Sequence, residues 1–389
     1  MNHVAYLIPT IDRIGGAEQQ VILLAKGLAG RGWEVTVIAL AGSGGEAAKG
    51  LKQSGVKYYS LEMRKGLADP RGWLRLRSWI AQNHPDVLHA HLPHASFLAR
   101  CLRIAMPVRV IVDTIHSPAT GSAAHHAGYR LTNRQPDAVT AVSHAAARPW
   151  IRAGLVSHRS LSIIPNGIDT DHWKRNHRAR AHMRQKLGLN DEFLWLAVGR
   201  LDPVKDHATL IKSFAQLSPH TRLVIAGSGS LEGELRTLAT ELGLYDRVTF
   251  AGFQNNILPW MQAADGFVLS SVWEGLPIAL LEASSCEVPA VITDIPGARE
   301  ALPVSRCDAA ARVGDPESLA SAMSALMLQP EAERRELGRQ ARASIRSTFS
   351  LDPVLYQWEN LFRNLLTENP QPTRFGKLAS TPVETFQFQ

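Results

Sequence analysis

Strand-like and helix-like segments alternate along most of this 389-residue chain, and this alternation limits its fold more than any other feature. It is typical of doubly wound parallel sheets with helices on both faces, so we expect an α/β fold. Ligands of such sheets bind beyond the carboxyl ends of the strands. Helices are predicted from Gly15 to about Gly30, over Arg71–Asn83 and near Ala95–Ile104. The predicted strands of the first half are Val4–Ile8, Glu34–Leu40, Lys57–Leu61, Asp86–His91, Val108–Thr114, Ala138–Val142 and Leu161–Ile164.

The second half repeats the alternation after a strongly marked turn at Pro165-Asn166-Gly167-Ile168-Asp169. We place a hinge there and predict two domains, residues 1–168 and 169–350, followed by a helix over 351–366. Residues 367–389 are polar and unpatterned, which predicts a mobile tail. The predicted strands are Leu194–Val198, Arg222–Ala226, Val248–Ala251, Gly266–Leu269 and Pro289–Thr293, with long helices at Pro316–Leu328, Glu331–Thr348 and Asp352–Leu366.

Composition excludes several classes of protein. No apolar run approaches the ~18 residues needed to cross a bilayer, and the start of the chain lacks the basic and long apolar regions of a signal peptide. The three cysteines, Cys101, Cys286 and Cys307, are isolated in the sequence. This pattern fits a reducing cytosol and argues against a disulfide framework or a zinc site.

Positive charge is concentrated in the first part of the chain. Residues 1–165 hold 19 Lys/Arg and 9 Asp/Glu, net +10, whereas residues 166–389 hold 23 and 26, net −3. Much of the excess lies between Arg64 and Arg77, interleaved with Trp73 and Trp79. A basic, aromatic helix of this kind can lie on an anionic membrane. The alternative is a solvated charged face with tryptophans directed into the core.

Two glutamates eight residues apart flank a predicted strand-to-helix turn. Backbone N–H groups at a helix start have no partner within the helix and attract a phosphate group. A carboxylate on each side of that phosphate could bind the hydroxyls of two sugars, which is the layout of a nucleotide-sugar. The segment reads Ser270-Ser271-Val272-Trp273-Glu274-Gly275-Leu276-Pro277-Ile278-Ala279-Leu280-Leu281-Glu282-Ala283.

This segment resembles the E-x7-E motif of the retaining GT-B glycosyltransferases, in particular the GT4 family. Other parts of the chain are similar to elements of the same family, and the resemblance covers about residues 3–366. It implies a GT-B fold: two Rossmann-like domains facing a cleft, with the acceptor on the first, the nucleotide on the second and a last helix that crosses back to the first. The matching elements are Gly15-Gly16, Asn166-Gly167-Ile168-Asp169, Gly199-Arg200-Leu201 with Lys205, Gly227-Ser228-Gly229 and Gly252-Phe253.

The resemblance also implies a role for each site residue. Glu282 would bind ribose hydroxyls, and Glu274 and His116 would bind the donor sugar. Arg200 and Lys205 would neutralise the leaving diphosphate together with the backbone of Gly275, Leu276, Pro277 and Ile278. Gly15 and Gly16 would lie over the diphosphate or the acceptor, Gly227 and Gly229 near the nucleotide, and Phe253 against the base. The implied mechanism needs no protein nucleophile, no metal and no cofactor apart from the nucleotide-sugar.

Two short patterns raise the alternative of a metal site. His89 and His91 would point to the same face of a strand, but no third ligand with suitable spacing stands out. Asp169-Thr170-Asp171 matches the Asp-x-Asp metal clamp of GT-A glycosyltransferases. Its position directly after the Pro-Asn-Gly turn instead resembles the GT4 hinge.

We therefore expect a cytoplasmic glycosyltransferase, either free or peripheral on the inner membrane face. UDP-sugars are the first expectation for the donor and GDP-mannose the second. The basic first domain suggests a lipid-linked or saccharide acceptor in surface polysaccharide or lipopolysaccharide synthesis. The alternatives are an epimerase or phosphorylase of the GT-B class and a non-catalytic nucleotide-sugar-binding scaffold. No nucleic-acid-binding motif is present in the sequence.

Overall fold

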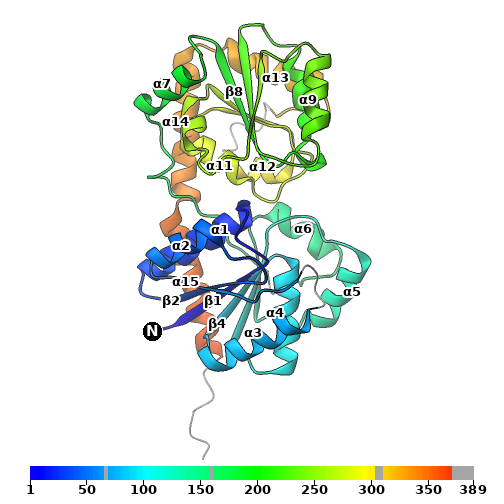
Figure 1. Ribbon diagram of the computed structural model, residues 1–389, viewed down its shortest axis with the longest axis vertical. Helices are drawn as coiled ribbons and strands as arrows, with labels where there is room; N and C mark the ends of the chain where they lie inside the picture. Colours follow the sequence, from blue (N-terminus) through cyan, green and yellow to red (C-terminus); the bar gives the residue numbers. More distant parts are fainter. Residues whose placement is uncertain (65–68, 158–160, 303–309, 370–389) are drawn as a thin grey trace, which may run out of the picture.

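Two α/β lobes stacked end to end make up the computed structural model, which describes residues 1–64, 69–157, 161–302 and 310–369 (Figure 1). The first lobe holds a parallel sheet in the order β3-β2-β1-β4-β5-β6-β7. This is the doubly wound α/β class expected from the sequence. The strands are β1 His3–Ile8, β2 Glu34–Ala39, β3 Lys57–Ser60, β4 Val87–His91, β5 Val110–Ile115, β6 Ala138–Ala141 and β7 Leu161–Ile163.

The second lobe holds a smaller parallel sheet in the order β10-β9-β8-β11-β12. The strand order reverses between β1 and β4 in the first lobe and between β8 and β11 in the second. Such switch points open a crevice at the carboxyl ends of the strands. The strands are β8 Phe193–Val198, β9 Thr221–Ala226, β10 Val248–Gly252, β11 Gly266–Leu269 and β12 Ala290–Ile292.

Helices cover both faces of each sheet. Those of the first lobe are α1 Gly16–Gly30, α2 Gly45–Gln53, α3 Pro70–Asn83, α4 Pro93–Ala105, α5 Ala123–Thr132 and α6 His144–Arg152. The second lobe contributes η2 Pro203–Lys205, α7 His177–Lys186, α8 His207–Phe214, α9 Glu232–Glu241, α10 Leu258–Ala263, α11 Ile278–Ser285, α12 Pro296–Ala301, α13 Pro316–Leu328 and α14 Glu331–Thr348.

Three helices of the first lobe have no individual prediction from the sequence: α2, α5 and α6. The N-cap residue of α2 is Gly44, whose φ of 76° is left-handed, and the helix itself contains Gly45 and Gly50. Helix α5 buries only Tyr129 and Thr132, so it lacks a clear apolar stripe. Helix α6 contains Pro149 in its interior, a residue that normally argues against a helix. Local sequence signals are weak in α2 and α5, whereas in α6 the capping Ser143 is opposed by the internal Pro149.

The strands are buried on both faces, as expected for a parallel sheet between helical layers. Along β1, Val4, Tyr6 and Ile8 join one core cluster, whereas Ala5 and Leu7 join the cluster on the opposite face. All five side chains are fully buried. The period-2 alternation of the strand therefore supplies two cores at once.

The last helix, α15 (Leu351–Glu368), leaves the second lobe and packs on the first. Trp358 and Phe362 are buried in the core cluster that contains β1. Glu359 accepts a hydrogen bond from Trp33 Nε1 at 3.0 Å and pairs with Arg31 at 2.8 Å. The helix continues two residues beyond the predicted end at Leu366, so the start of the predicted tail at residue 367 is helical. Residues 370–389 lie outside the described part of the chain.

Helix α3 carries the basic, aromatic segment. Trp79 is 9% exposed and packs in the core, as the structural alternative expects. Leu74 is 55% exposed, and the Arg77 guanidinium lies 5.9 Å from the centre of the Trp73 ring. The outer face of α3 thus combines arginine with exposed leucine. Within the described residues, no helix has the length and apolar character needed to cross a membrane.

Candidate active site between the lobes

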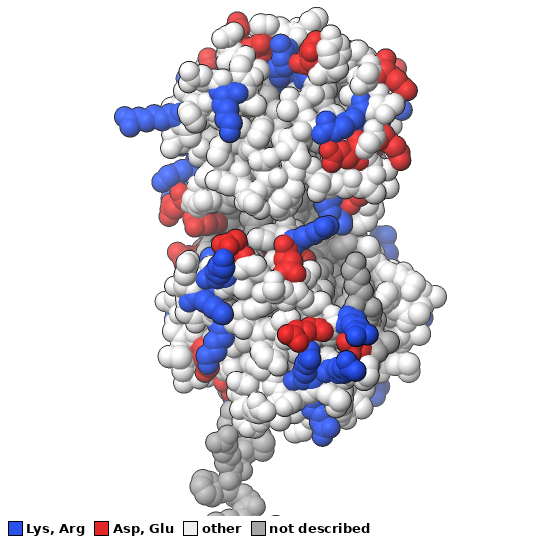
Figure 2. Space-filling view, viewed as in Figure 1, with Lys and Arg blue, Asp and Glu red and all other residues white. Residues whose placement is uncertain are grey.

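Two helix N-termini face each other across the gap between the lobes. Figure 1 shows α1 at the edge of the first lobe and α11 at the facing edge of the second, and Figure 2 shows a groove between the lobes with charged side chains along it. A Cβ on Gly16 would lie 3.1 Å from Ile278 Cδ1, so the absent side chain permits this approach. Gln19 of α1 donates a hydrogen bond to Glu282 of α11 at 2.8 Å.

The turn after β11 brings Glu274 onto Lys205. The Lys205 Nζ lies 2.5 Å from Glu274 Oε1, which also accepts from Ser271 Oγ at 2.7 Å. Ser270 Oγ donates to the Lys205 carbonyl at 2.8 Å, which ties η2 to this turn. The two charged side chains are 18% and 12% exposed. A carboxylate and an ammonium group are therefore held in fixed positions at the switch point of the second sheet.

Glu282 lies in the second turn of α11 and is only 4% exposed. Burial raises the pKa of this carboxyl to about 7, and the Gln19 hydrogen bond opposes part of the shift. In this arrangement Gln19 from the other lobe already occupies one carboxyl oxygen. A sugar hydroxyl that binds Glu282 would compete with Gln19 or replace it.

Arg200 does not join the Lys205–Glu274 pair. Its side chain is 77% exposed and forms an ion pair with Asp202 at 3.0 Å. Its charge still acts across the gap, because it lowers the pKa of Glu18 on α1, which burial raises. Arg200 therefore lies at the rim of the cleft, where it can move toward a bound anion.

The predicted glycines permit close approaches of backbone. A Cβ on Gly227 would lie 1.9 Å from the Gly199 carbonyl oxygen, and one on Gly229 would lie 2.2 Å from the Leu201 carbonyl oxygen. These glycines thus seat their loop directly on the Arg200 segment. Gly15 is the N-cap residue of α1, and its N–H donates to Glu18 Oε2 at 3.0 Å.

Gly275 lies at a close approach between the lobes. A Cβ at this position would lie 2.1 Å from the His116 carbonyl oxygen of the first lobe. Ser143 Oγ, the N-cap hydroxyl of α6, donates to the Gly275 carbonyl at 2.7 Å. Beside it, Leu276 is buried, Pro277 is the N-cap of α11 and Ile278 begins the helix without a side-chain cap. The first N–H groups of α11 are therefore available to a ligand.

His116 follows β5 and packs against His91. The His91 Nδ1 and His116 Nε2 atoms are 2.8 Å apart. Burial lowers the pKa of His116 to about 4 and that of His91 well below its ordinary value, so both rings are neutral near pH 7. Phe253, in contrast, is 55% exposed on the loop after β10.

The two metal alternatives gain no support from the described residues, among which no three His, Cys, Asp or Glu side chains gather as a metal site. His89 is fully buried, and its ring lies 4.6 Å from that of Trp358. Asp169 Oδ1 accepts backbone hydrogen bonds from Asp171 and His172, both at 3.0 Å. It therefore closes a local turn.

Several residues of the site have no individual prediction from the sequence: Glu18, Gln19, His91, Ser143 and Ser271 as cleft residues. Ser143 carries a readable signal, because it is an N-cap serine before a helix. Its partner, Gly275, is 132 positions away and on the other lobe. Glu300 likewise accepts from the backbone N–H groups of His144 and Ala145 across the gap. Hydrogen bonds between residues this far apart in the sequence depend on the tertiary fold, so the local sequence does not predict them.

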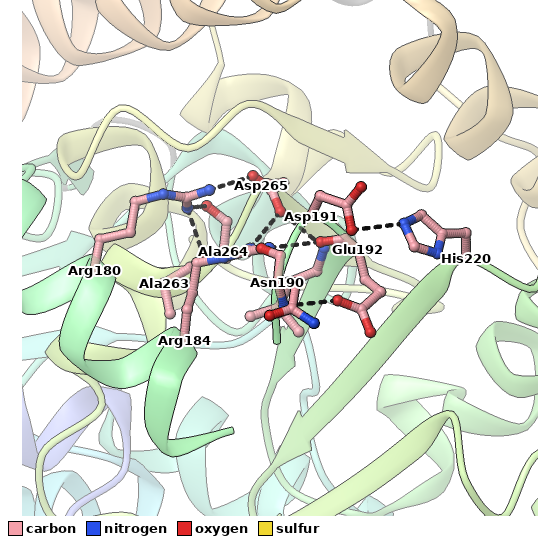
Figure 3. Close-up of polar contacts among 10 residues, drawn as sticks. Arg180, Arg184, Asn190, Asp191, Glu192, His220, Ala263, Ala264 and Asp265 are labelled. Atoms are coloured by element: carbon pink, nitrogen blue, oxygen red, sulfur yellow. Dashed lines mark hydrogen bonds and ion pairs between the residues drawn. The ribbon is translucent and has the colours of Figure 1, made fainter. Parts of the chain in front are cut away.

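A polar cavity of about 320 Å³ lies at the amino ends of the strands of the second sheet, away from the cleft at their carboxyl ends. Figure 3 shows Arg180 and Arg184 of α7 directed at Asp265, with ion-pair distances of 2.5 and 2.8 Å. Arg180 also donates to the carbonyls of Ala263 and Ala264 at the end of α10. These bonds join α7 and α10 to the start of β11, so we assign the cluster a structural role.

Known proteins resemble the chain over most of its length. The family model described as "Glycosyl transferases group 1" matches residues 179–344, and the one described as "Glycosyltransferase Family 4" matches residues 14–172. Together they cover both lobes and the cleft between them.

Curated relatives and solved structures extend the likeness. An N-acetylgalactosaminyltransferase of Campylobacter jejuni that acts on a diphospho-undecaprenol is 37% identical over 37% of this chain and 38% of its own length, well under half of that relative. The lipopolysaccharide core biosynthesis glycosyltransferase LpsE of Rhizobium meliloti is 28% identical over 87% of this chain and 93% of its own. The structure of Anabaena HepE in complex with UDP-glucose superposes with a TM-score of 0.81 at 23% identity, covering 93% of this chain and 99% of that chain.

Proposed function

The chain belongs to the group 1, family 4 glycosyltransferases with the GT-B fold, and from that premise we propose that it transfers a sugar from a nucleotide-diphosphate sugar to an acceptor in cell-surface glycan synthesis. One observation carries the proposal. The Lys205–Glu274 pair and the start of α11 lie at the switch point of the second sheet, where they meet His116 of the first lobe at the gap between the lobes.

Each residue has a role in the proposed reaction. The nucleotide binds the second lobe, with its diphosphate at the uncapped start of α11 and its ribose at Glu282. Lys205 and Arg200 stabilise the charge that develops on the leaving diphosphate. Glu274 and His116 orient the donor sugar, and the first lobe presents the acceptor hydroxyl.

We propose transfer with retention at the anomeric carbon. The acceptor hydroxyl attacks from the face that the diphosphate leaves, and a phosphate oxygen accepts its proton. Positioning and charge stabilisation then carry catalysis. Lys205 and Arg200 supply the leaving-group charge in this scheme, so EDTA should leave the rate unchanged.

The proposed donor is a UDP-sugar. The fold neighbour from Anabaena is bound to UDP-glucose, and a relative from Escherichia coli, 27% identical over 59% of this chain, is named for transfer from UDP-Gal. A relative from Mycolicibacterium smegmatis is named as GDP-mannose-dependent, so GDP-mannose is the second donor to test.

The proposed acceptor is a lipid-linked saccharide at the cytoplasmic face of a membrane. Two relatives are named for acceptors on diphosphoundecaprenol. The outer face of α3, with Arg77 and exposed Leu74, provides a basic surface with an apolar side chain for contact with anionic lipid. Vesicle flotation tests this contact: anionic vesicles should retain the protein at low salt and release it at high salt. Equal recovery with neutral vesicles would contradict it.

Nucleotide release tests the reaction itself. Wild-type protein is incubated with UDP- or GDP-sugars, with and without a lipid extract that contains undecaprenyl-linked saccharides. We expect release of one nucleotide that depends on the extract, and its loss in Glu274→Gln. Conversion of the nucleotide-sugar without acceptor would favour an epimerase, and absence of turnover despite binding would favour a scaffold.

A further inference from the structure

A row of three histidines runs from the core of the first lobe to the cleft. His89 and His91 lie on β4, with ring centres 4.1 Å apart, and His116 follows β5 with its ring 5.1 Å from that of His91. His89 and His91 are fully buried. Each of these two has one ring nitrogen that is buried and has no hydrogen-bond partner among the described residues: Nδ1 of His89 and Nε2 of His91.

A chain of threonine hydroxyls determines where the proton of His89 lies. Thr140 Oγ1 donates to the Asp113 carbonyl, so its single hydrogen is used. Thr114 Oγ1, 2.7 Å from Thr140 Oγ1, must then donate to it. His89 Nε2, 2.6 Å from Thr114 Oγ1, must in turn be the donor. The orphan Nδ1 of His89 is therefore the unprotonated nitrogen.

The same reasoning applies to His91. If His91 Nδ1 donates to His116 Nε2, the orphan His91 Nε2 is an unprotonated acceptor. If His116 Nε2 donates instead, His91 must bury an N–H group with no acceptor. Orphaned buried N–H groups are rarer than under-satisfied acceptors, and leaving a donor unpaired costs about 1–3 kcal/mol. The first arrangement is favoured, and it matches that of His89.

We propose that His91 is a positioning residue, which holds the His116 ring through its Nδ1–H and fixes the tautomer in which His116 Nδ1–H donates to an oxygen of the donor sugar. The donor sugar as the ligand of His116 rests on the proposed function. The tautomer of His116 rests on the hydrogen bonds of the histidine row alone. In the alternative tautomer His116 Nδ1 would be an acceptor and would select a different partner on the sugar. His91 therefore determines what kind of hydrogen bond the first lobe offers to the ligand.

Burial reinforces this role because it keeps the whole row neutral. The pKa values of His89, His91 and His116 all lie below the ordinary histidine value, chiefly through desolvation. A neutral His116 ring carries one N–H group. The hydrogen bonds of its two ring nitrogens therefore determine which nitrogen is protonated.

Ring nitrogen spectroscopy tests the tautomer without any substrate. Protein labelled with ¹⁵N-histidine is examined by long-range ¹H–¹⁵N correlation, with His116 assigned by its loss in His116→Gln. We expect a protonated-type shift at His116 Nδ1 and an unprotonated-type shift at Nε2. The reverse pattern would overturn the proposal, whether or not the protein transfers sugar.

Three variants test the consequence for turnover. His91→Leu removes the donor and should lower kcat by about 10- to 100-fold, by analogy with losing a residue that orients a metal-binding histidine. His91→Asn places an amide N–H near the former Nδ1 and should recover most of that loss. His89→Leu is the matched control: it removes the neighbouring buried ring, which hydrogen-bonds Thr114 and not His116, so kcat should stay near wild type while the melting temperature falls.

Equal loss of kcat in His91→Leu and His91→Asn would reduce His91 to a packing residue and contradict the proposal. If the wild-type protein shows the expected tautomer but transfers no sugar, the proposed function fails while the tautomer assignment stands. If His91→Leu does not fold, the wild-type spectrum and His91→Asn still decide the question.

Discussion

At the scale of single residues, Glu282 has the most unusual surroundings. It is 4% exposed, and its pKa is raised from 4.5 to about 7. Between these two values the unfolded chain loses its proton while the folded protein keeps it. The stability contributed by this group is therefore complete below about pH 4.5 and is lost as pH rises through about 7.

Glu282→Gln should remove this pH dependence and keep an oxygen acceptor for Gln19. We expect the variant to be more stable than wild type at pH 8, by up to about 3 kcal/mol, and equal to it near pH 4.5. Urea unfolding at both pH values measures the difference. A constant difference across the pH range would show that burial of this carboxyl does not govern its ionisation.

Arg200 allows function to be separated from stability, because it is exposed at the rim of the cleft. Arg200→Ala should change the free energy of unfolding by less than about 0.5 kcal/mol. It should lower kcat by about 10²- to 10³-fold, the range for loss of one preorganised charge-stabilising group. Arg335→Ala, on α14 and away from the cleft, is the control. Wild-type turnover in Arg200→Ala would contradict its proposed role.

Residue types and spacing were enough to name most residues of the candidate site. They predicted only some of the contacts between those residues. The Glu274 turn and Lys205 follow adjacent strands, β11 and β8, so their meeting was predictable from the fold class. The involvement of Gln19 with Glu282 was not, because the two residues lie on different lobes. Arg200 follows β8, as the sequence predicts, but its exposed side chain pairs with Asp202, which the strand pattern does not indicate.

At the scale of elements, the backbones of the two lobes approach each other closely at Gly275. Gly275→Ala would place a methyl group 2.1 Å from the His116 carbonyl oxygen. This oxygen belongs to the backbone of the other lobe, so relieving the clash requires a shift of backbone. We expect the variant to fold, because each lobe has core clusters of its own besides the apolar cluster that the two lobes share. We expect it to hold the lobes farther apart and to have a lower kcat. Small-angle scattering and steady-state kinetics measure the two effects.

Gly233→Ala is the matched control for this variant. Gly233 lies in the first turn of α9, and a Cβ there meets nothing within 4 Å. The substitution should leave both scattering and kcat unchanged, with stability equal or slightly raised. Scattering identical to wild type in Gly275→Ala would show that the contact adjusts locally.

Element boundaries were predictable where the sequence marks them clearly. The bounds of α13, α14 and β11 agree with the sequence prediction: Asp315 caps the start of α13, α14 begins directly after Pro330, and β11 is a continuous buried apolar run. Helices α2 and α5 contain glycine or bury few side chains, so their local signals were weak, and in α6 the internal Pro149 argued against the helix that Ser143 caps. Burial against the sheet supplies what the local sequence lacks.

At the scale of the whole molecule, α15 connects the lobes. It follows α14 of the second lobe directly, yet Trp358 lies 2% exposed in the core of the first. A hinge motion of the lobes must therefore be accommodated near Ser350 as well as at the Gly167 turn, which Gln20 holds with two hydrogen bonds.

Trp358→Ala should destabilise the first lobe by about 3–5 kcal/mol, as expected for removal of a buried aromatic side chain. Calorimetry should show one transition at lower temperature and a second that is unchanged. Tyr356→Ala on the same helix is the control, because Tyr356 is 61% exposed. An equal shift of every transition would mean that the lobes unfold as one unit.

Nucleotide-sugar binding in the cleft is the central claim, and calorimetric titration tests it most directly. UDP-, GDP- and ADP-sugars are titrated in the presence of EDTA into wild-type protein, Glu282→Ala and the distant control Glu336→Ala. We predict that one nucleotide series binds wild type and Glu336→Ala equally and binds Glu282→Ala at least about tenfold more weakly, a loss of about 1.4 kcal/mol. Absence of binding in every series, or unchanged binding in Glu282→Ala, would contradict the assignment of this cleft.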